Sequence, residues 1–145
     1  MTLLSVPQDA VSDRAPPAPR PAGSARGSVR VLLRLEGFAA LAAALFIYGR
    51  AGFSWPALAV LFLAPDLTML FYFAAPRIGA LAYNLVHTFA LALALTLVGF
   101  FGGPPAAAAC GLILIAHVGF DRMLGYGLKY ASSFSDTHLG RIGRR

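Results

Sequence analysis

Six polar side chains interrupt otherwise apolar stretches of the chain, and they are of the types that bind metals or carry protons. Asn84 and His87 are three residues apart, so on a helix they share one face. His117 and Asp121 are four residues apart and share a face in the same way. Imidazole and carboxylate together suit a divalent transition metal. The candidate residues are Glu36, Asp66, Asn84, His87, His117 and Asp121.

One hypothesis for these residues is a metal site, either structural or hydrolytic. The first-choice ligands are His87, His117 and Asp121, and Asp66 is a fourth ligand or a general base. Glu36 and Asn84 would orient the histidines by hydrogen bonds from outside the ligand set. The H-x-x-x-D and N-x-x-H spacings permit such a site but are not specific, and the chain has neither HExxH nor CxxC. No cofactor is established, and a divalent transition metal is the candidate.

Two other hypotheses stay open. The polar residues form a structural core, whose interhelical hydrogen bonds contribute well under ~2 kcal/mol each, or they mark an ion or proton pathway. An alternating-access carrier built from four short spans would need a homo-oligomer. A phosphate-binding loop is excluded because GYGLK lacks the required spacing. A serine triad is excluded because no serine lies in the apolar segments, and an aspartyl dyad of Asp66 and Asp121 has little support.

The composition places these residues in a membrane. Hydrophobic residues make up 58% of the 145 residues and charged residues only 12%, against about 25% in soluble domains, and the mean hydropathy is +0.70. A soluble domain of this size could not bury so much apolar surface, which excludes a soluble enzyme. The net charge of +6 comes from bases that flank apolar segments, so we expect the lipid bilayer as partner and no nucleic acid.

The apolar segments predict an all-α fold, an integral membrane four-helix bundle over residues 29–128. The expected spans are about 30–48, 55–74, 78–101 and 105–124, each close to the ~20 residues that cross a bilayer. Ser54 and Pro56 are expected to start the second span, and Pro65 to kink it beside Asp66. A disordered Pro/Ala/Arg-rich leader is expected over residues 1–28 and a cytoplasmic tail over 129–145. Cys110 is expected to be a packing residue.

The bases predict the orientation. With the N-terminus in the cytoplasm, eleven bases lie inside and only Arg50 outside, so both termini are predicted to be cytoplasmic. All six candidate residues then lie roughly 6–13 Å from the cytoplasmic ends of their spans, at ~1.5 Å per residue, and form one layer. The tail, with Asp136 and His138, either folds over this layer as a lid or lies as a solvated basic segment on anionic headgroups.

Several short segments of the chain carry a family resemblance. They are RLEG at 34–37, APDL at 64–67, YN at 83–84 with His87, HVGFDR at 117–122, GYGLKY at 125–130, and Phe134 with DTHLG at 136–140. From about residue 30 to its end, the chain resembles domain-of-unknown-function family 4260, a family of small bacterial membrane proteins. The resemblance implies four spans and a multi-pass location in the bacterial cytoplasmic (inner) membrane. It implies no activity, substrate or catalytic residue.

Overall fold

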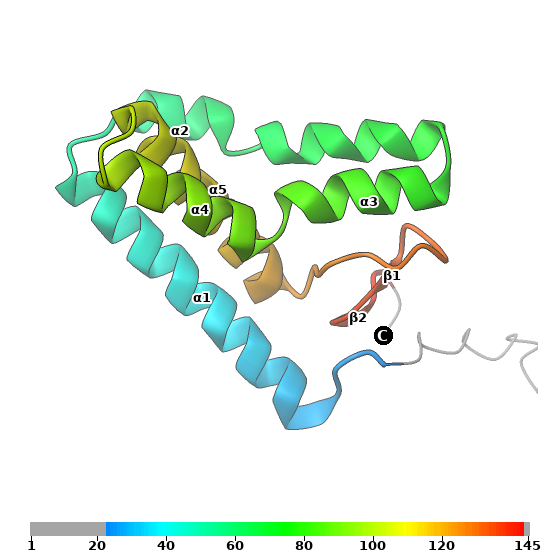
Figure 1. Ribbon diagram of the computed structural model, residues 1–145. Helices are drawn as coiled ribbons and strands as arrows, with labels where there is room; N and C mark the ends of the chain where they lie inside the picture. The colour runs from blue at the N-terminus through cyan, green and yellow to red at the C-terminus, as the bar shows by residue number, and fades with distance from the viewer. Residues whose placement is uncertain (1–22, 144–145) are drawn as a thin grey trace, which may run out of the picture.

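The computed structural model describes residues 23–143, and its helices follow the apolar segments (Figure 1). Four segments are long and apolar enough to cross a membrane, which confirms the all-α, four-span class. The elements are α1 (Gly27–Arg50), α2 (Trp55–Leu61), the 3₁₀ helix η1 (Ala64–Phe73), α3 (Pro76–Val86), α4 (Phe89–Phe100), α5 (Pro105–Leu124) and the strands β1 (Asp136–Thr137) and β2 (Gly140–Arg141).

The second span is divided in two by Pro65. Ser54 caps its first part, α2, by accepting a hydrogen bond from the backbone N–H of Ala57 at 3.3 Å. Proline has no N–H to give the carbonyl four residues before it, and its ring clashes with that carbonyl, so α2 ends at Leu61. The chain resumes as η1, in which the Thr68 hydroxyl donates to the Pro65 carbonyl at 2.7 Å. Asp66 therefore stands in the first turn of a new helical segment.

The third span is also divided, which the sequence analysis did not predict. The continuous helix expected over residues 78–101 ends at Val86 and restarts at Phe89. Thr88 has an extended backbone, and its hydroxyl accepts a hydrogen bond from the N–H of Ala90 at 3.3 Å. A side-chain cap of this kind starts a helix without proline or glycine. His87 consequently occupies the break between α3 and α4.

The helix α5 packs closely against both α1 and α4. Small residues allow this close approach: a Cβ added to Gly119 would lie 2.7 Å from the Gly37 carbonyl oxygen, and one added to Gly111 would overlap the backbone of Thr96. The α3 helix packs against η1 instead, and these two helices run side by side in Figure 1. The apolar core between α1 and α5 consists of Ala44, Tyr48, Leu112, Ile113 and Ala116.

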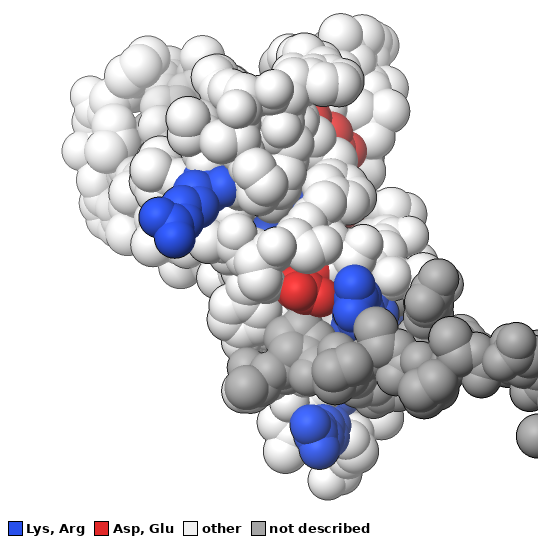
Figure 2. Space-filling model, turned by 90° about the vertical axis from the view of Figure 1, so that its right-hand side faces the viewer, with Lys and Arg blue, Asp and Glu red and all other residues white. Residues whose placement is uncertain are grey.

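Large apolar side chains cover much of the outer surface. Phe46, Val60 and Phe73 are 70%, 77% and 90% exposed, which a soluble monomer would not show over whole helices. Uncharged residues also dominate the face in Figure 2, where the described charged side chains occur as a few separate groups. These surfaces are those of a protein whose helices face lipid.

The tail folds back between α3 and the start of α1 (Figure 1). The Asn84 side chain binds it by two hydrogen bonds, donating to the Lys129 carbonyl at 2.9 Å and accepting from the Lys129 N–H at 2.7 Å. The tail then pairs β1 with β2 in an antiparallel hairpin. The sequence left open whether the tail folds against the helices or lies as a solvated segment, and the described part of the tail is folded.

The leader expected over residues 1–28 extends past the point where the structure begins α1. Residues 1–22 lie outside the described residues, but Ser24 is buried and Gly27 already begins α1. The N–H of Ala25 donates to the carbonyl of His138 at 2.7 Å. This contact places the two described ends of the chain side by side.

Candidate metal centre

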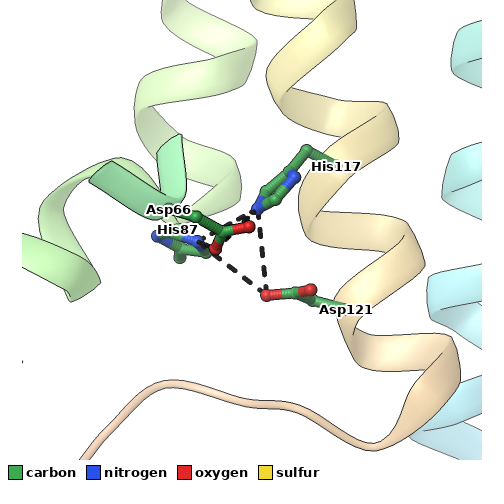
Figure 3. Close-up of side chains that lie close together, drawn as sticks. All are labelled: Asp66, His87, His117 and Asp121. Carbon is green, nitrogen blue, oxygen red and sulfur yellow. Dashed lines mark hydrogen bonds and ion pairs between the residues drawn. The ribbon is translucent and has the colours of Figure 1, made fainter. Parts of the chain in front are cut away.

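Four of the six polar candidates converge in one place. Asp66 comes from η1, His87 from the break after α3, and His117 and Asp121 from α5 (Figure 3). Each offers one ligand atom, and these four atoms lie within 4.8 Å of one another. The residues are up to 55 positions apart in the sequence, between Asp66 and Asp121, so tertiary packing assembles the group.

The distances between the histidine nitrogens and the other ligand atoms are close to the edges of a metal coordination shell. The two histidine Nε2 atoms are 3.1 Å apart. Asp66 Oδ1 lies 3.5 Å from His87 Nε2 and 3.6 Å from His117 Nε2, and Asp121 Oδ2 lies 3.8 and 3.9 Å from the same two atoms. A tetrahedron of ligands at about 2.0–2.1 Å from a metal has edges of about 3.3–3.4 Å. Small movements of the side chains would therefore give this geometry.

A hydrogen bond fixes the orientation of His87. Its Nδ1 lies 2.9 Å from the carbonyl oxygen of Tyr83, which can only accept, so Nδ1 carries the proton. In the neutral ring, Nε2 then has its lone pair directed at the other three residues. The Tyr83 ring stacks on the imidazole with 3.5 Å between centroids. This arrangement, a backbone carbonyl behind a ligand histidine, is common at metal sites.

His117 faces the same point with its Nε2. Its ring is buried, and the Phe62 ring contacts it edge-on with centroids 5.3 Å apart. Its Nδ1 is buried and has no hydrogen-bond partner among the described residues. Its Nε2 lies 3.1 Å from the lone pair of His87 Nε2, so with both rings neutral the proton of His117 is on Nε2 and donates to His87.

The two carboxylates form the open side of the cluster. The Asp66 side chain is 32% exposed and that of Asp121 is 15% exposed, whereas both histidines are buried. The Tyr83 hydroxyl donates a hydrogen bond to Asp121 Oδ2 at 2.8 Å. A ligand arriving from outside would therefore meet the carboxylates first.

The cluster has more lone pairs than protons to share among them. With neutral histidines, the Tyr83 hydroxyl donates to Asp121 and His117 donates its one N–H to His87, so neither supplies a proton to Asp66. Lys129 beside the cluster balances at most one of the two carboxylate charges, and the second is costly in a partly buried site. The local chemistry therefore calls for a bound cation or for extra protons at this point.

The structure places the remaining candidates elsewhere. Glu36 is exposed on α1 and is not in the cluster, so the expected single layer of six residues is wrong in this position. Gly37 lies on the face of α1 that meets α5. The adjacent residue, Glu36, points about 100° away from that face. Asn84 binds the backbone of Lys129 rather than a histidine. Neither side chain therefore orients the histidines as expected.

The two tail residues named as a candidate lid serve the tail itself. Asp136 accepts a hydrogen bond from Ser132 at 2.8 Å, and its other oxygen lies 3.6 Å from Arg141 Nε. The His138 N–H donates to the carbonyl of Leu128. Burial, and next the positive charge of Arg122, lower the pKa of His138 below its ordinary value. The part of the tail beside the cluster contains Lys129 and Phe134 instead.

Two residues near the cluster were not singled out from the sequence. Tyr83 lies four residues before His87, so its carbonyl is the natural partner of that ring on one helix face. Lys129 counted only as a topology charge, although its side chain is 5% exposed. Burial lowers the pKa of Lys129 to about 8, although the charges of Asp121 and Asp66 oppose this. No spacing in the sequence indicates where a tail residue will fold.

Among the comparisons with known proteins, a family model matches the part of the chain that contains this centre. No curated protein and no solved structure matches the chain. The family model described as domain of unknown function (DUF4260) matches residues 30–142, a range that contains all four residues of the cluster, Asn84 and Lys129. The match covers most of the chain, from α1 to the end of the described tail, and the protein therefore belongs to this family.

Proposed function

We propose that this protein binds one divalent transition metal within the membrane, with His87, His117, Asp66 and Asp121 as ligands. The observation that carries the proposal is the convergence of four ligand atoms from three helical elements within 4.8 Å. Hydrogen bonding alone does not satisfy all four, because the one proton of a neutral His117 is used on the inward lone pair of His87 and none is left for Asp66. A dication between them would balance both carboxylate charges.

The ligand types narrow the choice of metal. Two imidazoles and two carboxylates favour zinc, iron, manganese or cobalt over Mg²⁺ and Ca²⁺, which prefer oxygen alone. Cu(I) prefers sulfur ligands, and Cys110, the single cysteine, lies outside the group and is exposed, so the expectation that it packs in the interior is wrong. We therefore expect zinc or another borderline divalent ion.

The open side of the centre supports hydrolysis as its chemistry. A bound dication supplies Lewis acidity and lowers the pKa of a water that it holds. Asp66, the more exposed carboxylate, would hold the metal through Oδ1 and could accept the proton of that water on Oδ2, while His87 and His117 would hold the buried side. Lys129 adds a positive charge beside the cluster for a negatively charged reacting group.

Metal analysis of the purified full-length protein tests the proposal. We expect about one zinc or similar ion per chain at pH 7.5 without chelators. Asp121→Asn keeps the shape but removes a charge that neutralises the metal, and should lower affinity by roughly 100-fold. Asp136→Asn is the matched control and should keep the metal, because Asp136 lies in the tail hairpin.

The same pair of variants separates the metal site from a purely structural polar core. Under the structural hypothesis, wild type carries no stoichiometric metal, and Asp121→Asn folds and melts nearly as before. If wild-type protein purified at pH 7.5 carries no metal, the metal proposal is wrong.

We also propose that the protein lies in the bacterial cytoplasmic membrane with both termini in the cytoplasm. The neighbouring positions of Ala25 and His138 support a common side for the two described ends. A reporter fused after Arg145 should be active in the cytoplasm, and one inserted at Gly103, between α4 and α5, should report the far side. The opposite pair of signals would reverse the orientation.

A further inference from the structure

A cavity of about 370 Å³ opens directly onto the carboxylates of the cluster. It lies where η1, α3 and α5 meet the folded tail, and Figure 3 shows the chain after α5 passing across the same open side. Its size is at the lower end of the range for small-molecule sites, roughly 300–1,000 Å³. Anything that fills it would touch Asp66 and Asp121, so it is the natural approach to the centre.

The charge at this cavity favours an anion. The Lys129 ammonium donates to the Phe134 carbonyl at 3.0 Å and lies over the rings of Phe134 and Tyr83, at 3.5 and 4.8 Å from their centroids. No carboxylate lies within ion-pair distance of it among the described residues. If Asp66 and Asp121 neutralise a bound dication, Lys129 leaves the site with one positive charge in excess.

The remaining wall of the cavity is apolar. Met69 comes from η1, Phe120 from α5, and Phe134 and Ile142 from the tail. Phe134 is 43% exposed, and neighbouring residues of η1, such as Leu67 and Leu70, face outward with exposures of 65% and 60%. A hydrocarbon chain leaving the cavity would therefore pass from one apolar surface to another.

We propose that this cavity binds an anionic amphiphile, a phosphate- or carboxylate-bearing lipid whose headgroup lies between Lys129 and the carboxylates of the cluster. Its hydrocarbon part packs against Met69, Phe120 and Phe134. This inference rests on the proposed metal site and gives it a class of substrate. A free anion of the same charge would use only the Lys129 side of the cavity, so the two sources differ in what the apolar wall contributes.

Dodecyl phosphate is a suitable probe, added to the full-length protein in an uncharged detergent and loaded with Co²⁺. We expect it to change the visible cobalt spectrum at concentrations at least about tenfold below those of inorganic phosphate, because the dodecyl chain gains apolar contacts. Dodecanol, which has no charge, should leave the spectrum unchanged. Equal responses to dodecyl phosphate and inorganic phosphate would overturn the amphiphile, and a response to dodecanol would overturn the anion.

Variants of Lys129 test the headgroup contact. Lys129→Met should weaken dodecyl phosphate by roughly 10–100-fold, the usual effect of losing a hydrogen bond to a charged group, while Lys129→Arg keeps most of the affinity. Arg50→Met, a change of charge at the other end of α1, should bind like wild type. Cobalt content should be the same in all four proteins. Unchanged affinity in Lys129→Met would overturn the proposal.

The readouts separate this inference from the metal proposal. Protein that takes up cobalt but does not respond to dodecyl phosphate refutes the lipid site and leaves the metal site standing. Protein that takes up no cobalt refutes the metal site. It then refutes the lipid site as well, because the anion would face two carboxylates without the dication that neutralises them.

Discussion

Replacing both cluster histidines, His87→Ala with His117→Ala, should abolish metal binding. A four-ligand zinc site is worth about 10–16 kcal/mol, so each ligand contributes roughly 100–1,000-fold in affinity. Without two of the four ligands, the remaining carboxylates would hold a transition metal only weakly. Elemental analysis of the purified variant should give a metal content near zero, against about one per chain in wild type.

The third histidine of the chain provides the control. His138→Ala changes a tail residue that takes no part in the cluster, and it should keep the full metal content. Each single variant, His87→Ala and His117→Ala, should fall between wild type and the double variant in affinity. Equal metal contents in His138→Ala and the double variant would mean that the metal binds elsewhere or that the loss is a general effect on folding.

Gly111→Val should prevent the normal packing of α4 against α5. A Cβ at this position would overlap the backbone N and the side-chain oxygen of Thr96 and would lie 2.7 Å from the Ala92 carbonyl oxygen. Backbone atoms cannot move aside as a side chain can, so we expect a loss at or above the upper end of the ~1–3 kcal/mol that overpacking commonly costs. Unfolding in mixed micelles should occur at a clearly lower denaturant fraction than in wild type.

The adjacent residue gives a matched control for this substitution. Cys110→Val adds bulk one position earlier on the same helix, but Cys110 is exposed, and its unfolding should stay close to that of wild type. Two valine variants that unfold at the same point would show that the contact between α4 and α5 does not limit stability.

The membrane class and the four spans were predictable because they follow from local features. Long apolar runs identify the helices, and Ser54 and Pro65 mark points where the backbone must be capped or broken. The division at His87 was not predictable in this way, since neither proline nor glycine precedes it and the Thr88 cap is a weak signal. The break matters because it releases His87 from the regular helix.

The membership of the cluster was only partly predictable. His117 and Asp121 share a face of one helix, so their proximity follows from spacing alone. The exclusion of Glu36 depends on which face of α1 meets α5, and Gly37 and Gly119 decide this by their close approach. The role of Asn84 depends on where the tail folds, which no local pattern encodes. Contacts within one helix are readable in a sequence, while contacts between elements depend on packing.

The division of the helices into two groups bears on how the protein matures in the bilayer. The α1 and α4 helices each pack closely against α5, and η1 packs with α3, but few backbone atoms of η1 or α3 approach α5. The cluster joins these groups, with one carboxylate from η1, one histidine beside α3 and two residues from α5. A metal bound there would cross-link these two groups of helices. Maturation would then end with metal delivery, and cells starved of the ion would accumulate inserted chains that proteases can still open.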